Sequence, residues 1–103
     1  MAEKTIAGVQ VNVSDDGYLE DMSQWNEDIA KEIAGEIGIE LTDKHFEVLN
    51  YLREKTEAGE SLSIRKVGKS GIVDIKGLYK LFPKGPLKFS SKIAGIPKPA
   101  SCV

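Results

Sequence analysis

Cysteine, histidine and tryptophan each occur only once among the 103 residues, and this scarcity limits the chemistry of the chain. The single cysteine, Cys102, excludes a disulfide within one chain and a zinc site built mainly from cysteines. The single histidine, His45, has no second histidine or cysteine at ligand spacing, so we expect no metal site and no cofactor. We expect His45, in the first turn of a helix, to be partly packed or exposed to solvent.

Long apolar runs are also missing. No segment approaches the roughly 20 apolar residues needed to span a bilayer. The first ten residues lack the basic start and the apolar stretch of a signal peptide. Together with the lone cysteine, these absences predict a cytoplasmic protein that does not contact a membrane. The length predicts a single domain over residues 1–103.

Acidic residues are scarce in the second part of the chain. Residues 1–61 hold 15 acidic and 5 basic residues, a balance of -10. Residues 62–103 hold Asp74 against nine bases, a balance of +8. The bases are Arg65, Lys66, Lys69, Lys76, Lys80, Lys84, Lys88, Lys92 and Lys98. This asymmetry predicts an acidic partner, either a nucleic acid or an acidic protein surface, unless folding mixes the two halves on one surface.

The local patterns predict a hairpin followed by helices. Residues 4–13 alternate apolar and polar side chains about a turn at Ala7-Gly8, which is typical of two short strands. Asn26 and Thr42 are N-cap residues for helices over 27–37 and 43–58. The first helix continues an apolar stripe formed by Trp25, Ile29, Ile33 and Ile37.

Three shorter helices are expected over residues 64–70, 75–82 and 87–94. The first two, joined by a glycine-containing turn, resemble a helix-turn-helix. Two prolines after Gly95 favour an extended tail, so residues 95–103 are predicted to form a mobile arm. The fold class is therefore mainly α: a small orthogonal helical bundle with an N-terminal β-hairpin, a helix-turn-helix-like corner and a flexible C-terminal arm.

Cys102 is the side chain that carries the most chemistry. A free cysteine is usually buried, but this one follows a Pro-Lys-Pro segment that we expect to be extended and exposed. The thiolate is the reactive form, and the neighbouring carboxylate of the chain end disfavours it. Nearby cations would favour it, and Arg65, Lys84 and Lys98 are the candidates. A terminal thiol without a function is the alternative.

The chain resembles the DsrC/TusE family in several ordered motifs. They are the run Leu78–Pro86, the run Lys92–Pro99, the ending Cys102-Val103, and the earlier Asp16-Gly17-Tyr18-Leu19, Ser23-Gln24-Trp25, Leu41-Thr42 with His45 and Val48, and Ile64-Arg65. The resemblance covers nearly the whole chain and is far more specific than a single short motif.

The resemblance implies a helical fold with a mobile arm, and a penultimate cysteine that carries sulfur as a persulfide or mixed sulfide. That role falls on Cys102, with Arg65 and Lys84 at basic positions near the arm. The family includes the gamma component of dissimilatory sulfite reductase and the relay protein of tRNA wobble-uridine thiolation. Its full DsrC members carry a second cysteine eleven residues earlier, where this chain has Ser91.

We therefore predict a sulfur carrier that works with a sulfur-donor protein and a sulfur-acceptor protein rather than as a stand-alone enzyme. Two alternatives stay open. One is a regulatory protein that binds DNA through the helix-turn-helix-like corner. The other is a gamma-type subunit associated with sulfite reductase, against which Ser91 argues.

Overall fold

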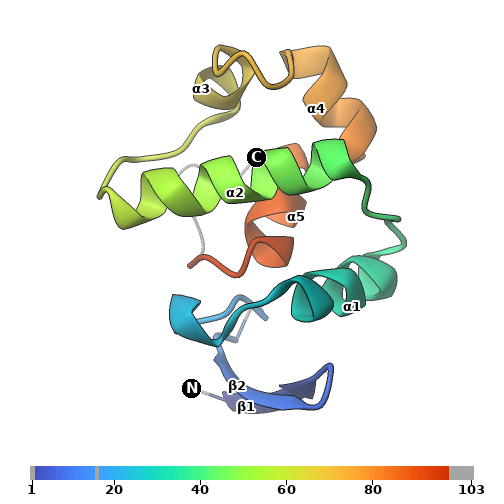
Figure 1. The fold of residues 1–103 in the computed structure, drawn as a ribbon, viewed down its shortest axis with the longest axis vertical. Coiled ribbons are helices and arrows are strands. Elements are labelled where there is room, and N and C mark those ends of the chain that lie inside the picture. Colours follow the sequence, from blue (N-terminus) through green and yellow to red (C-terminus); the bar gives the residue numbers. More distant parts are fainter. Residues whose placement is uncertain (1, 16, 98–103) are drawn as a thin grey trace.

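The computed structural model describes residues 2–15 and 17–97. Its elements are β1 (Ala2–Ile6), β2 (Val9–Val13), the 3-10 turn η1 (Met22–Gln24), α1 (Glu27–Ile37), α2 (Asp43–Glu57), α3 (Ile64–Gly68), α4 (Ile75–Leu81) and α5 (Pro86–Ile93). The hairpin lies at one end of the long axis, with α1 beside it, α2 and α5 in the middle, and α3 and α4 at the other end (Figure 1). The predicted mainly α fold with an N-terminal hairpin is confirmed.

The hairpin is antiparallel and turns at Ala7-Gly8, as predicted, with Ile6 opposite Val9. Ala7 has a φ of 51° and Gly8 a φ of 78°. Positive φ at both central residues is the pattern of a type I′ turn, whose twist matches that of paired strands. Val11 is buried, whereas Val9, next to the turn, is partly exposed, so only the far end of β2 faces the core.

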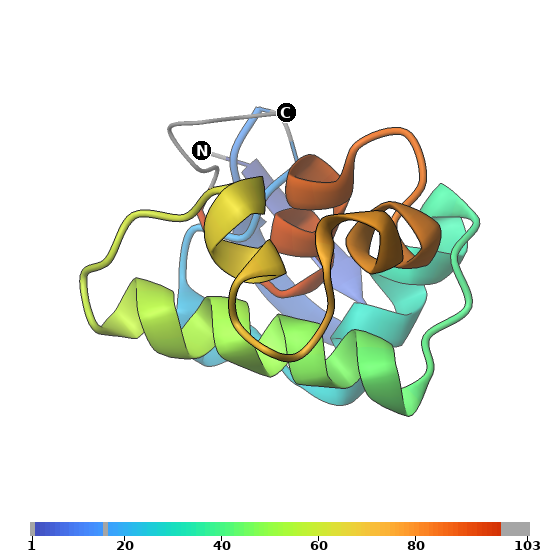
Figure 2. The ribbon, with the colours of Figure 1, turned by 90° about the horizontal axis from the view of Figure 1, so that it is seen from above.

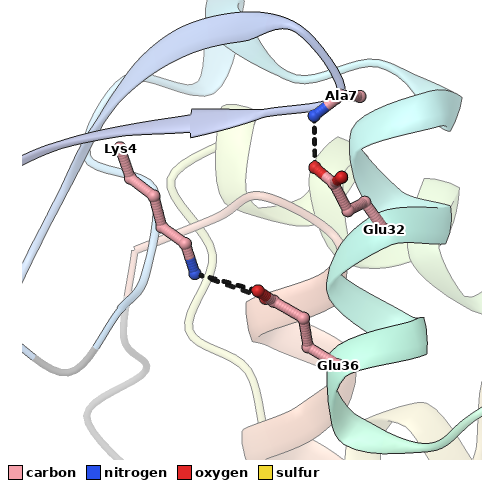
Figure 3. Close-up of polar contacts among 4 residues, drawn as sticks. All are labelled: Lys4, Ala7, Glu32 and Glu36. Atoms are coloured by element: carbon pink, nitrogen blue, oxygen red, sulfur yellow. Dashed lines mark hydrogen bonds and ion pairs between the residues drawn. The ribbon is translucent and has the colours of Figure 1, made fainter.

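Two polar contacts join the hairpin to α1 (Figure 3). The Ala7 N–H donates a hydrogen bond to the Glu32 carboxylate, and Lys4 Nζ lies 3.3 Å from a carboxylate oxygen of Glu36. Both partners of the ion pair are about half exposed, so it adds little stability. The contact to Ala7 supplies an acceptor for a turn N–H and fixes the hairpin against the helix.

The observed ends of α1 and α2 agree closely with the ends predicted from the sequence. Asn26 Oδ1 accepts a hydrogen bond of 2.9 Å from the Ile29 N–H at the start of α1. Gly38 ends the helix in the left-handed conformation, with a φ of 95°. Thr42 precedes α2, and Gly59 follows it after one further residue. The predicted bounds of both helices are confirmed to within one residue.

Helix α5 lies at the centre of the molecule and contacts α1, α2 and α4 (Figure 2). Pro86 occupies its first position, where a missing N–H costs nothing and the fixed φ suits a helix. Its buried residues are Pro86, Leu87, Ser90, Ser91 and Ile93. The core therefore depends on the segment that leads directly to the cysteine-bearing end of the chain.

Helices α3 and α4 pack against each other and form the predicted corner. Ser63 and Asp74 cap them, since their side-chain oxygens accept from the N–H groups of Lys66 and Gly77. Both helices end one or two residues earlier than predicted.

His45 is buried, and the expectation that it would be partly packed or exposed is wrong. Its Nδ1 accepts a hydrogen bond of 3.1 Å from the Thr42 N–H, which satisfies a donor at the start of α2. Its Nε2 donates to the Leu81 carbonyl at 2.9 Å, and its ring meets Phe82 edge-on. The ring therefore joins the start of α2 to the end of α4. Sequence reasoning missed this contact because Leu81 lies 36 residues away.

We expect Ala7→Asn to stabilise the protein. Asparagine tolerates the left-handed region that alanine occupies here, and a non-glycine residue there costs roughly 1–2 kcal/mol. The melting temperature checks this. Ala7→Val, with a branched side chain at the same positive φ, is the matched control and is expected to lower it. A melting temperature that falls in both variants would contradict the assignment of the turn.

We expect His45→Ala to lower the free energy of unfolding by roughly 2–3 kcal/mol, because the change removes a helix cap and leaves the Leu81 carbonyl unsatisfied. His45→Gln is the control, since glutamine at this position of a capping box can still accept from the Thr42 N–H. In urea unfolding, His45→Gln is expected to lose clearly less free energy of unfolding than His45→Ala. Equal losses would mean that the cap contributes nothing.

Candidate functional site at the root of the cysteine-bearing segment

The predicted site residues divide into two groups. Cys102 and Lys98 lie outside the described residues. Arg65 is exposed on α3, and Lys84 is exposed in the turn between α4 and α5. Within residues 2–15 and 17–97, neither of these two side chains makes a hydrogen bond or an ion pair, and the whole of α4 separates them along the chain. Both charges are thus unneutralised by the described part of the chain.

Lys84 has an unusual backbone conformation. Its φ of 73° places a long side chain in the left-handed region, which is uncommon for a residue other than glycine or asparagine. It lines a surface pocket of about 380 Å³ together with Ile37, Ile39, Pro83 and Phe89. Lys84 thus lines a partly apolar hollow from a turn with an uncommon backbone conformation.

A packed segment at the end of α5, which we call the arm root, comprises residues 93–96 and precedes Cys102 in the sequence. Ile96 is buried, and its N–H donates to the Ser91 carbonyl at 3.3 Å. Gly95 has a φ of +68° and turns the chain out of α5. The predicted mobile arm began at residue 95, but Gly95 and Ile96 pack into the domain. Mobility of the later residues stays a prediction.

Trp25 covers the arm root. Its Nε1–H donates a hydrogen bond of 2.8 Å to the Ile93 carbonyl. A β-carbon added at Gly95 would lie 2.2 Å from the indole ring, so only glycine fits beneath it. Trp25 is half-buried and packs against the core rather than lying inside it. The tryptophan that the sequence assigned to the α1 stripe thus also holds the start of the arm.

Arg53 fastens the same region from α2. Its guanidinium donates hydrogen bonds of 2.9 Å to the Ala94 carbonyl and to the Met22 carbonyl. Its central carbon lies 4.4 Å from the Trp25 ring centroid, a cation–π distance. Burial lowers the pKa of Arg53 and the charge of Glu57 raises it, and the group stays protonated. One side chain thus links η1, α2 and the end of α5.

Sequence reasoning missed Arg53 and the role of Gly95. Gly95 carried a signal only as the end of a helix, and Arg53 carried none, because its partners lie 31 and 41 residues away. No local pattern marks a charged side chain that will be folded over a tryptophan.

Ser91, at the position of the second cysteine in full DsrC members, is completely buried on α5. Its Oγ has no hydrogen-bond partner among the described residues. The residue lies two positions before the arm root, and its carbonyl accepts a hydrogen bond from the Ile96 N–H. A second thiol here would stand next to the point at which the arm begins.

Metal chemistry and membrane spanning find no support in the described part of the chain. Among residues 2–15 and 17–97, no group of three or more histidine, cysteine, aspartate or glutamate side chains could hold a metal ion. No described helix combines the length and the apolar character that crossing a bilayer requires.

The fold defines a class of small, mainly helical proteins with an N-terminal hairpin and a packed arm root after the last helix. Residues 5–103 match the family model described as DsrC like protein. The sulfurtransferase TusE of Salmonella typhimurium is 41% identical over 104 residues, which is 93% of this chain and 95% of the relative. The chain therefore belongs to the DsrC-like family, as predicted.

Solved structures agree. The solution structure of Allochromatium vinosum DsrC is 35% identical, with a TM-score of 0.80 over 99% of this chain and all of the other. The oxidized gamma-subunit of the dissimilatory sulfite reductase (DsrC) from Archaeoglobus fulgidus is 32% identical, with a TM-score of 0.79 over the same shares.

We expect Gly95→Ala to destabilise the protein by roughly 2–4 kcal/mol, because the new methyl group collides with Trp25 and the φ is unfavourable. Gly59→Ala is the matched control. Gly59 has a φ of +78° and no atom within 4 Å of an added β-carbon, so it measures the cost of φ alone. The difference between the two variants in free energy of unfolding, measured in urea, gives the cost of the collision with Trp25. Equal losses would show that the indole moves aside freely.

Proposed function

We propose that this protein is a sulfur carrier, which accepts sulfur on Cys102 as a persulfide and passes it to a partner protein. The observation that carries the proposal is the match to the DsrC-like family, which runs through residue 103 and so includes the lone cysteine. The name of the Salmonella typhimurium relative, a sulfurtransferase, supports the same chemistry.

The chemistry needs no oxidant. The Cys102 thiolate attacks the outer sulfur of a donor persulfide, a new S–S bond forms on Cys102, and the donor leaves as a thiolate. In the second step an acceptor thiolate attacks the outer sulfur of the Cys102 persulfide, and the Cys102 thiolate is released. Since no second thiol exists in the chain, sulfur leaves Cys102 by attack from another molecule.

The domain's part in this proposal is to present the thiol. The arm root is held by Trp25 and Arg53, and seven residues follow Ile96 in the sequence. Arg65, Lys84 and Lys98 are the cations proposed to favour the Cys102 thiolate when the segment lies against the domain. A carrier must deliver its group into other proteins' sites, so a thiol that follows a packed arm root in the sequence suits the task. We place the protein in the cytoplasm.

The DNA-binding alternative has weaker support. Both helices of the helix-turn-helix-like corner are short: α4 contains seven residues and α3 contains five. A gel-shift assay with duplex oligonucleotides at physiological salt tests it directly.

The sulfite-reductase alternative draws support from the Archaeoglobus fulgidus gamma-subunit structure. It is weakened by Ser91, which removes the internal thiol pair of the two-cysteine members.

We expect intact-mass analysis, after incubation with a low-molecular-weight persulfide, to show one added sulfur atom that a reductant removes. Mild oxidant is expected to give a covalent dimer and no internally bridged monomer. Cys102→Ser is expected to lose both products with an unchanged melting temperature, while the neighbouring Ser101→Ala variant keeps them. Cells of Salmonella typhimurium that lack their own relative provide the functional test. Equal rescue of sulfur transfer by wild type and Cys102→Ser would disprove the carrier function.

A further inference from the structure

Helix α4 exposes apolar side chains to solvent. Ile75 and Tyr79, four residues apart, are 46% and 45% exposed and form one row along the helix. Lys76 and Lys80, both exposed, form the neighbouring row. We call these four residues the α4 face. Among the described residues, the one other large hydrophobic side chain that is comparably exposed is Val9 on the hairpin.

The α4 face is held in a defined position. Leu78 on the same helix is fully buried and anchors the helix in the core. A β-carbon at Gly68 would lie 2.7 Å from Ile75 Cγ1, so the absent side chain lets α4 pack closely on α3. Lys44 Nζ donates to the Ile72 carbonyl at 3.2 Å and fastens the turn before α4. The two apolar side chains therefore remain exposed on a packed helix.

The charge around the α4 face is not neutralised within the described chain. Over residues 62–97, Asp74 is the one acidic residue, and its carboxylate is engaged at 2.6 Å with the Gly77 N–H. The ion pairs among the described residues use Lys4, Lys44 and Lys55 instead. Glu40 lines the same small pocket as Lys80 without pairing with it.

We propose that the α4 face docks an acidic surface of the protein that exchanges sulfur with Cys102. This inference rests on the proposed function. An apolar centre with an aromatic residue, flanked by cations, is the composition of a protein–protein contact. Complementary charge speeds such an encounter and suppresses wrong partners. A nucleic-acid interface is more polar and more strongly positive, and two apolar side chains at the centre do not suit a phosphate backbone.

The test compares two captures of the partner in Salmonella typhimurium cells that lack their own relative and express this chain. A photo-crosslinking amino acid replaces Tyr79 in one strain and Val9 in a control strain. Val9 lies on the hairpin at the opposite end of the molecule (Figure 1). Separately, diamide traps the protein that forms a mixed disulfide with Cys102. Both covalent products are identified by mass spectrometry.

We expect the crosslinker at position 79, and not that at position 9, to capture the same protein as Cys102. The double change Lys76→Glu and Lys80→Glu is expected to reduce the crosslinked product about tenfold or more. Lys31→Glu with Lys55→Glu changes the net charge equally on other helices and is expected to reduce it much less. The amount of crosslinked product formed when Lys76 and Lys80 are unchanged is also expected to fall when salt is added.

Three results would overturn the docking proposal: a product that nuclease degrades, a captured protein different from the Cys102 partner, or a product that the α4 charge reversal leaves unchanged. If sulfur loads onto Cys102 in those cells, the carrier function stands and only the docking surface is wrong. If Cys102 gains no sulfur and forms no mixed disulfide, the proposed function itself fails.

Discussion

The interaction on which the site depends is the contact of Arg53 and Trp25 with the arm root. The guanidinium makes two charge-assisted hydrogen bonds to carbonyls from different segments and lies over the indole ring. The indole in turn bonds to the Ile93 carbonyl and covers Gly95. Because these contacts converge at the end of α5, they hold the arm root in one position.

The packed arm root and the proposed carrier residue, Cys102, are separate parts of the chain. Helix α5 contacts α1, α2 and α4, and Ile93, Ala94 and Ile96 of the arm root belong to the buried core. Cys102, the proposed carrier of sulfur, comes later in the sequence, outside the described residues. In the proposed function, a partner recognises the packed domain by its shape and exchanges sulfur with Cys102.

The charge distribution survives folding. Helix α1, which carries Glu27, Asp28, Glu32 and Glu36, lies at the hairpin end of the molecule. Helices α3 and α4, which carry Arg65, Lys66, Lys76 and Lys80, lie at the other end (Figure 1). The alternative in which folding mixes the two charges over one surface is therefore not realised for these helices. The resulting field can orient an approaching partner before contact.

Local features of the sequence determined most of the elements. The caps Asn26, Ser63 and Asp74 act on N–H groups three residues ahead, and the Ala7-Gly8 turn joins adjacent strands, so neighbouring residues suffice to predict them. Family motifs likewise led to the prediction that Cys102 is the reactive group. Tertiary structure alone decided the rest. The bonds of His45 to Leu81, Arg53 to Ala94 and Trp25 to Ile93 span 36, 41 and 68 residues. Such pairs leave no periodic trace in the sequence, because only the packing of separate helices brings their atoms within hydrogen-bonding distance.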